Sequence, residues 1–234
     1  MVAFIRYQLF SLIRSLKFIP PAVVFLIWIF ILYAYKNVPI LSSYAVSSIA
    51  LYLVSTWLTM SMFSLEEESE KHILFSHLQR KVRYLFGKWL SLLLLVVPLL
   101  LFAILFPIIT SSFKGSMNIG VCFFAIYNHV IFSALGILVG TFCSATKLAA
   151  KKYGWLSAVL VLVVSLSIKS LLEMTAYFKW ITWVFPPVFK VIDHMGGGEV
   201  IQNQETLVSD GIFVSLYLLI GTLVLVYLFR KNES

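Results

Sequence analysis

The chain has 234 residues, of which 61% are hydrophobic and 12% are charged, whereas a soluble domain carries about 25% charged residues. This composition excludes a water-soluble globule and predicts an all-α polytopic membrane protein. The net charge is +8, but the basic residues are spread between apolar segments. The excess charge therefore indicates membrane topology, and we expect membrane lipid and no nucleic acid as partner.

Residues 2–18 precede the first apolar segment and predict a helix that lies in the membrane interface. Val2, Ile5 and Leu9 fall near one face of this helix, and Arg6 and Arg14 fall largely opposite them. Such an amphipathic pattern suits a helix in the plane of the membrane surface. A cleaved signal peptide is disfavoured because no small-residue cleavage site follows. The remaining alternative is an extension of the first span, against which the two arginines argue.

Six apolar segments approach the length of about 20 residues that a helix needs to cross a bilayer. They lie at about 18–35, 38–63, 87–109, 117–144, 153–174 and 211–229. Pro20-Pro21 suit a first helical turn, and Pro98 is expected to kink the third span. We therefore predict one transmembrane domain over residues 1–234 with six spanning helices.

The distribution of Lys and Arg predicts the orientation of these spans. Thirteen of the 18 basic residues lie in the N-terminal segment, the loop after the second span and the start of the third, the loop after the fourth, and the C-terminus. The other five lie between the remaining spans. By the positive-inside rule both termini are cytoplasmic, in a multi-pass protein of the cell membrane.

The loop at 64–86 combines acidic, apolar and basic residues in that order. Four glutamates precede an apolar patch of Ile73, Leu74, Phe75 and Leu78, and Arg80, Lys81 and Arg83 follow. A helix here would have acids near its N-terminus and bases near its C-terminus, which complements its dipole. A charge run alone would suit a solvated surface loop. Four large hydrophobes on such a loop, however, normally cover a partner or a lipid surface.

The same loop also raises an enzymatic alternative, with Glu66 to Glu70 beside His72 and His77. No H-E-x-x-H arrangement and no second ligand cluster accompanies these residues, and the chain has no phosphate-binding loop. We therefore expect that the chain is not an enzyme and has no catalytic residue and no metal site. If the protein uses ATP, another chain must bind it.

Polar residues inside the spans are candidates for function because burying them in lipid is costly. The candidates for a translocation path are Ser48, Ser55, Thr59, Asn128 and His129. The alternative for Asn128 and His129 is hydrogen bonding between packed helices.

Small residues favour close helix packing in the fourth span. Gly136 and Gly140 form a G-x-x-x-G pair, a motif that lets two helix backbones approach each other.

The segment at 175–207 predicts an outer aromatic hairpin or a short re-entrant pair of helices. Its aromatic residues are Tyr177, Phe178, Trp180, Trp183, Phe185 and Phe189. Pro186-Pro187 and the glycines at 196–198 interrupt it. Just before this segment, Lys169 and Glu173 have the i, i+4 spacing of an ion pair on one helix.

This arrangement of an interfacial helix, six spans, a long loop after the second span and an outer hairpin resembles the ABC type-2 export permeases over essentially the whole chain. The closest local likeness lies in the loop. Glu67-Glu68, Ile73-Leu74-Phe75, Lys81 and Gly87-Lys88 match the paired acids, apolar run, basic residue and Gly-Lys pair of that family. Ser69 and Leu78 depart from it, since glycine and proline are usual at these positions.

The resemblance implies a transmembrane subunit that pairs with a second permease chain, expected to be identical, and with two cytoplasmic ATP-binding subunits. ATP and Mg²⁺ would bind to those subunits, and no cofactor would bind this chain directly. The loop at 64–86 would supply the coupling helix that contacts the ATPase. The expected contact residues are Glu67, Glu68, Ile73, Leu74, Phe75, Leu78, Arg80 and Lys81.

The substrate class is an expectation by analogy. The spans carry no array of ionisable residues like that of ion-coupled carriers, which favours an apolar or amphipathic substrate. Small permeases of this family often export antimicrobial peptides or confer immunity to them, and this is the function we expect. The alternatives are export of a lipid or cell-wall precursor, a polytopic membrane enzyme, and a channel or immunity protein that sequesters its target.

Overall fold

The protein is a bundle of long apolar helices, as shown by a computed structural model that describes residues 1–115, 117–146, 153–174, 181–196 and 204–232. Within these ranges there is no strand, only an isolated bridge between Val38 and Phe113. The long helices are α3 (Ile40–Phe63), α5 (Lys81–Ile109), α6 (Ile119–Ala145), α7 (Gly154–Met174) and α10 (Gln204–Asn232). Each is long and apolar enough to cross a membrane. The predicted all-α polytopic membrane fold is confirmed.

Two shorter helices open the chain and meet at a sharp bend. The axes of α1 (Val2–Arg14) and α2 (Ile19–Leu32) differ by 77°, and together they count as a sixth candidate span. α2 alone has 14 residues, or about 21 Å, against a hydrocarbon core of about 30 Å. The bend shows that α1 is not a straight extension of α2, which was the alternative to a separate N-terminal helix.

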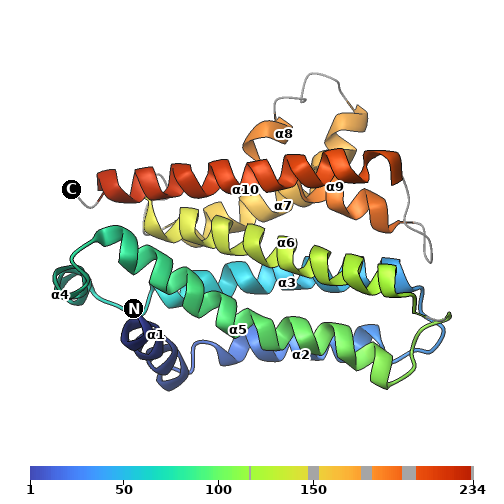
Figure 1. Ribbon diagram of the computed structural model, residues 1–234, viewed down its shortest axis with the longest axis horizontal. Coiled ribbons are helices and arrows are strands. Elements are labelled where there is room, and N and C mark those ends of the chain that lie inside the picture. The colour runs from blue at the N-terminus through green and yellow to red at the C-terminus, as the bar shows by residue number, and fades with distance from the viewer. Residues whose placement is uncertain (116, 147–152, 175–180, 197–203, 233–234) are drawn as a thin grey trace.

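α3 forms the centre of the bundle and packs side by side with α6 (Figure 1). Its buried side chains include Leu41, Leu51, Leu58 and Met62, each at most 2% exposed. By contrast, α2, α5 and α10 keep many large hydrophobic side chains exposed on their outer faces. A soluble protein would not leave so much apolar surface in water, whereas a bilayer accommodates it.

The N-terminus and the C-terminal end of α10 lie at the same end of the bundle, which we call the terminal end (Figure 1). Helix α4 (Glu68–Leu78) also lies there. At the opposite end, the α2–α3 and α5–α6 connections are tied together. The amide of Val38 donates to the Ser112 carbonyl at 3.0 Å, and the amide of Lys114 donates to the Val38 carbonyl at 3.1 Å.

Two helix boundaries differ from the sequence-based expectation. α5 begins at Lys81 rather than near 87, and α10 begins at Gln204 rather than near 211. Charged side chains interrupt the apolar pattern in both first turns, although the helices form there. The predicted loop at 64–86 therefore contains α4 and the first turns of α5. α5 also continues through Pro98 and Pro107.

Short helices fill the region of the predicted outer hairpin. They are α8 (Ile181–Val184), α9 (Val188–Ile192) and the 3₁₀ helix η2 (Asp193–Met195). Trp183 is 72% exposed, whereas Val188 and Met195 are fully buried. Several residues of the predicted hairpin lie outside the described residues, as do the loop lysines at 147, 151, 152 and 179. These hairpin residues are Tyr177, Phe178, Trp180, Gly197 and Gly198.

Candidate functional site

Helix α4, which connects α3 to α5 in the chain, is the candidate site because it lies beyond the ends of the long helices at the terminal end (Figure 1). Glu68 and Glu70 lie in its first turn and His77 in its last. Acidic side chains at a helix N-terminus are stabilising because they complement the positive end of the dipole. Gln79 follows the last residue of the helix and caps it in the left-handed conformation, with φ 58°. This residue lets the chain turn directly into α5.

The inner face of α4 packs on its own chain through Phe75. The Phe75 ring lies edge-on to Tyr84 of α5 at 5.0 Å and to Phe229 of α10 at 6.1 Å. Tyr84 and Phe229 stack on each other at 6.1 Å, and Leu74 and Leu78 pack at the edge of this cluster. We call Phe75, Tyr84 and Phe229 the aromatic cluster. It holds α4 against the N-terminal end of α5 and the C-terminal end of α10.

The apolar patch does not face outward as the sequence led us to expect. Phe75 is 7% exposed and Leu74 and Leu78 are partly buried, so only Ile73, at 59%, is open to a partner. The reason is that Tyr84 and Phe229 supply an apolar surface within the chain. Glu67, Glu68, His72 and His77 share the exposed side of the segment with Ile73.

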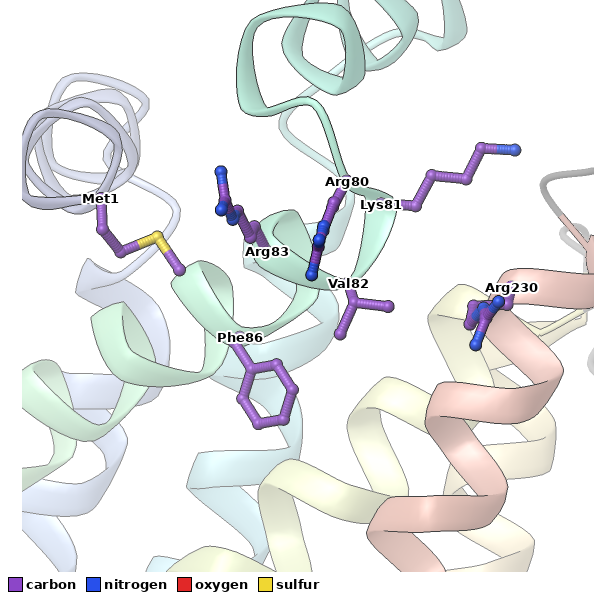
Figure 2. Close-up of a pocket in the computed structure, with 7 residues that line it drawn as sticks. All are labelled: Met1, Arg80, Lys81, Val82, Arg83, Phe86 and Arg230. Carbon is purple, nitrogen blue, oxygen red and sulfur yellow. The ribbon is translucent and has the colours of Figure 1, made fainter.

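Arg80 and Lys81, the two basic residues expected to contact the ATPase, lie at the junction of α4 and α5. Arg80 is the residue before the first turn of α5, and its side chain is exposed. Arg80 and Lys81 line one pocket, together with Arg83 from the first turn of α5 and Arg230 from the end of α10 (Figure 2). They therefore border a basic cavity as well as the exposed side of α4.

Behind α4, Glu66 and Lys88 form an ion pair that is closed to solvent. Lys88 Nζ lies 3.1 Å from Glu66 Oε2, with side-chain exposures of 0% and 2%. Lys88 Nζ also donates to the Met62 carbonyl at 2.9 Å and lies 4.7 Å from the Phe63 ring centre. A buried charge is tolerated only when it is paired and hydrogen-bonded. The lysine thus joins α5 to the end of α3.

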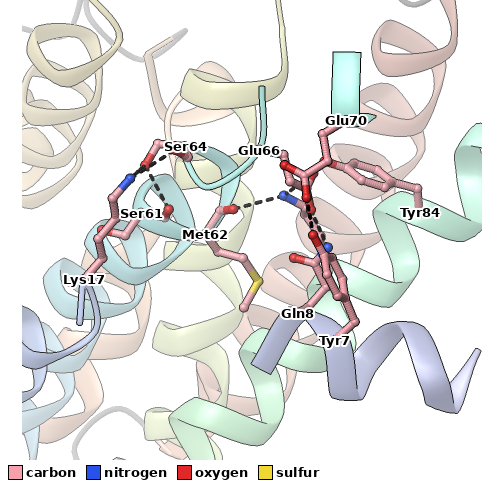
Figure 3. Close-up of polar contacts among 10 residues, drawn as sticks. Tyr7, Gln8, Lys17, Ser61, Met62, Ser64, Glu66, Glu70 and Tyr84 are labelled. Atoms are coloured by element: carbon pink, nitrogen blue, oxygen red, sulfur yellow. Dashed lines mark hydrogen bonds and ion pairs between the residues drawn. The ribbon is translucent and has the colours of Figure 1, made fainter. Parts of the chain in front are cut away.

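Helix α1 is tied to the same carboxylate. Gln8 Nε2 donates to Glu66 Oε1, and the Tyr84 hydroxyl donates to Glu66 Oε2 (Figure 3). We call Gln8, Glu66, Tyr84 and Lys88 the buried network. Gln8 Oε1 is buried and has no hydrogen-bond partner within the described ranges. The network joins α1, α5 and the α3–α4 connection through one carboxylate.

A second contact joins α1 to α4 itself. The Tyr7 hydroxyl donates to Glu70 Oε1 (Figure 3). This hydrogen bond, with partial burial, raises the pKa of Tyr7 to about 12. Nearby, Lys17 Nζ donates to the Ser64 carbonyl at 3.1 Å.

Gly87 explains how α1 comes close enough to α5. A Cβ built at this position would meet the Phe4 ring, with the Cε1 atom at 2.6 Å. The absence of a side chain at Gly87 therefore makes room for Phe4, which is 7% exposed. The Gly87-Lys88 pair thus makes two contacts. Gly87 lets Phe4 of α1 pack against α5, and Lys88 forms the ion pair with Glu66.

The candidate path residues are all fully buried between α3 and its neighbours. The hydroxyls of Ser48, Ser55 and Thr59 donate to carbonyls of their own helix. His129 contacts Ser47 Oγ through Nε2 at 2.9 Å, and Asn128 Nδ2 lies 3.1 Å from the Met195 sulfur. Asn128 Oδ1 has no partner within the described residues. In this conformation these residues are part of the packed interior.

The small-residue motif of α6 packs against α3 of the same chain. A Cβ at Gly136 would lie 2.6 Å from the Tyr52 carbonyl oxygen, and one at Gly140 would lie 2.8 Å from that of Thr56. Because these oxygens are backbone atoms, α3 and α6 could not stay as close together if larger residues replaced the two glycines.

Sequence reasoning missed the buried network and a second polar cluster near the opposite end. Lys190 Nζ lies 2.5 Å from Asp210 Oδ1, and His194 Nε2 lies 3.2 Å from Asp210 Oδ2, which joins α9 and η2 to α10. Lys169 Nζ lies 2.7 Å from Asp193. The side chain of Glu173, its expected partner, lies outside the described residues. The sequence did contain a signal for Lys88, Lys190 and Asp210. Each of these charged residues interrupts an apolar run and so requires a partner.

No protein-family model matches the chain, and no curated protein or solved structure matches it. Within the described residues, no group of three or more His, Cys, Asp and Glu side chains could hold a metal ion.

Proposed function

We propose that the chain is the transmembrane permease subunit of an ATP-driven ABC exporter, with ATP and Mg²⁺ bound by a separate cytoplasmic subunit. The observation that carries this proposal is the attachment of α4. A short helix at the terminal end presents Ile73 between polar and charged side chains, while its other face is fixed to the bundle. Such an exposed face suits docking into a cleft of a partner.

The buried network and the aromatic cluster couple a movement of α4 to the ends of several long helices. A displacement of α4 acts on α10 through Phe75, and on α1 and the α3–α4 connection through Tyr7–Glu70 and Glu66. Separating these elements would leave the Lys88 charge buried without its partner, which is costly. Closure of the ATPase subunits would therefore move the ends of several spans together at the terminal end. This movement would switch the access state of the permease.

The interior of the bundle supports an amphipathic peptide as the substrate. α3 and α6 contain no Asp, Glu, Lys or Arg, and their buried hydroxyl groups mostly donate to backbone carbonyls. The contact between α3 and α6 therefore offers no charged binding group to a hydrophilic metabolite. By analogy with small permeases of the family that the sequence resembles, we favour export of antimicrobial peptides, or immunity to them, over export of a lipid or cell-wall precursor.

The proposal also includes the orientation and the assembly. The terminal end carries α4 and most of the described basic residues, and under the positive-inside rule this supports a cytoplasmic location for that end. Gly136 and Gly140 already pack against α3, so a second copy of the chain would pair through a different surface.

The test is purification of the tagged full-length chain from its native membranes in mild detergent, followed by measurement of ATP hydrolysis. A subunit with a phosphate-binding loop should co-purify, and the preparation should hydrolyse ATP in the presence of Mg²⁺. A chain that purifies without any ATPase and still protects cells against amphipathic peptides would contradict the proposal. That outcome would favour sequestration instead.

A further inference from the structure

The pocket at the start of α5 is strongly basic. It has a volume of about 760 Å³, and it lies between Met1 and the end of α10 (Figure 2). Four of its seven lining residues are Arg80, Lys81, Arg83 and Arg230, and no acidic residue lines it. Four positive charges around one cavity repel each other, so an anion in the cavity would be favoured.

The arginines of this pocket are not neutralised by the chain. Within the described residues, Arg80, Arg83 and Arg230 form no ion pair; Arg83 makes only a long contact of 3.5 Å with the Leu78 carbonyl. A guanidinium group binds phosphate oxygens in a bidentate manner. The lining is therefore suited to a phosphate group.

A second, apolar groove lies further along α5 and α10, next to the basic pocket. It has a volume of about 400 Å³ and is formed by α5, α6 and α10, with Trp89, Leu93, Ala134 and Leu223 among its lining residues. Phe86 lines the basic pocket, and its ring lies 5.2 Å from that of Trp89 in the groove. Ten residues of helix separate Arg83 from Leu93, or about 15 Å. The lining thus changes from basic to apolar over a distance comparable to part of an acyl chain.

We propose that the pocket and the groove together bind a phospholipid with an anionic headgroup, taken from the leaflet at the terminal end. The headgroup phosphate would lie among Arg80, Arg83 and Arg230, and an acyl chain would lie along Trp89 and Leu93. Basic pockets between transmembrane helices are known to suit anionic headgroups. The apolar groove distinguishes this ligand from a free phosphate, which needs only the basic part. The inference depends on the membrane-spanning fold and not on the proposed transport function.

The test measures lipid bound to the purified full-length chain in neutral detergent by native mass spectrometry, with phosphatidylglycerol and phosphatidylcholine as probes. The wild-type chain should retain phosphatidylglycerol in preference to phosphatidylcholine. The double variant Arg83→Gln/Arg230→Gln should bind phosphatidylglycerol at least about tenfold more weakly, because each basic residue near the headgroup contributes substantially. Arg83→Lys/Arg230→Lys should keep the preference, since it keeps both charges.

The matched control removes two charges at the other end of the bundle. Lys36→Gln/Lys114→Gln changes two exposed lysines and should leave binding unchanged. Equal loss in the control and in the arginine variant would overturn the proposal, because net charge alone would then explain binding. Unchanged binding in the arginine variant would also overturn it.

A second pair of measurements separates a lipid from a free anion. Ala134→Phe places a ring in the groove and should weaken phosphatidylglycerol binding while leaving the basic pocket intact. Excess inorganic phosphate should not displace the lipid. Full displacement by phosphate, with no effect of Ala134→Phe, would show a free-anion site and contradict the lipid proposal.

Discussion

Glu66 and Lys88 form a 3.1 Å ion pair although both side chains are closed to solvent. The pair lies where α1, the end of α3, and α5 meet, directly behind α4. In the proposed mechanism a movement of α4 would pass through this point, since separating the two charges while they remain buried would be costly.

The first prediction concerns the stability that this pair provides. Lys88→Met leaves the Glu66 carboxylate buried without its cation, so we expect the free energy of unfolding to fall by about 3–5 kcal/mol. Lys169→Met is the control, because the Lys169–Asp193 pair is 57% and 30% exposed and should contribute at most about 1 kcal/mol. Reversible unfolding in detergent micelles measures both. Similar losses in the two variants would contradict a special role for the buried pair.

The second prediction concerns the contact between α3 and α6. Gly140→Ala puts a Cβ 2.8 Å from the Thr56 carbonyl oxygen and should cost about 1–3 kcal/mol through overpacking. Gly120→Ala serves as the control, since a Cβ there meets no atom within 4 Å and alanine has the higher helix propensity. Thermal unfolding of the two variants should show a lower midpoint for Gly140→Ala only. A normal midpoint would mean that the helices can move apart without cost.

The third prediction separates the two faces of α4. Phe75→Ala removes a ring that is 7% exposed and should destabilise the protein by about 3–5 kcal/mol. Ile73→Ala changes a side chain that is 59% exposed, and such surface changes usually stay within about 0.5 kcal/mol. The same unfolding assay compares them. If Ile73→Ala were the more damaging variant, the assignment of the inner and outer faces would be reversed.

The fourth prediction concerns orientation. Ser76→Cys on α4 and Lys114→Cys after α5 change exposed residues at the two ends of the bundle, in a chain whose Cys122 and Cys143 are first replaced by alanine. A membrane-impermeant maleimide should label position 114 in intact cells and position 76 only in inverted vesicles. Labelling of position 76 in intact cells would show that the terminal end faces outward.

The sequence predicted the five long apolar helices well because apolar runs of about 20 residues require burial wherever they occur. The predicted first span, at about 18–35, corresponds to α2, which has only 14 residues. The sequence placed the start of α5 too late, since Lys81, Arg83 and Lys88 resemble loop residues in a hydropathy pattern. In the structure, Lys88 is fully buried inside the helix. A pattern of single residues cannot show that Glu66 will neutralise a charge on another helix.

The direction of the apolar patch on α4 was also beyond the sequence. Ile73 and Phe75 are close in the chain and similar in hydrophobicity, yet one is exposed and the other buried. The difference arises from Tyr84 and Phe229, which form the surface that Phe75 packs on. Phe229 is distant in the sequence, so only the folded chain reveals which side of α4 is available.

If the exposed face of α4 docks an ATPase, as we propose, a charge placed on that face should release the ATPase. Ile73→Asp puts a charge at the only large apolar side chain exposed on α4, whereas Ile119→Asp makes the same change at a residue that is 75% exposed at the opposite end. Both chains are purified from membranes, and the co-purified ATP hydrolysis is compared per mole of chain. We predict that Ile73→Asp loses the associated ATPase while Ile119→Asp retains it. Full ATP hydrolysis with Ile73→Asp would show that the exposed face of α4 is not the docking surface for an ATPase.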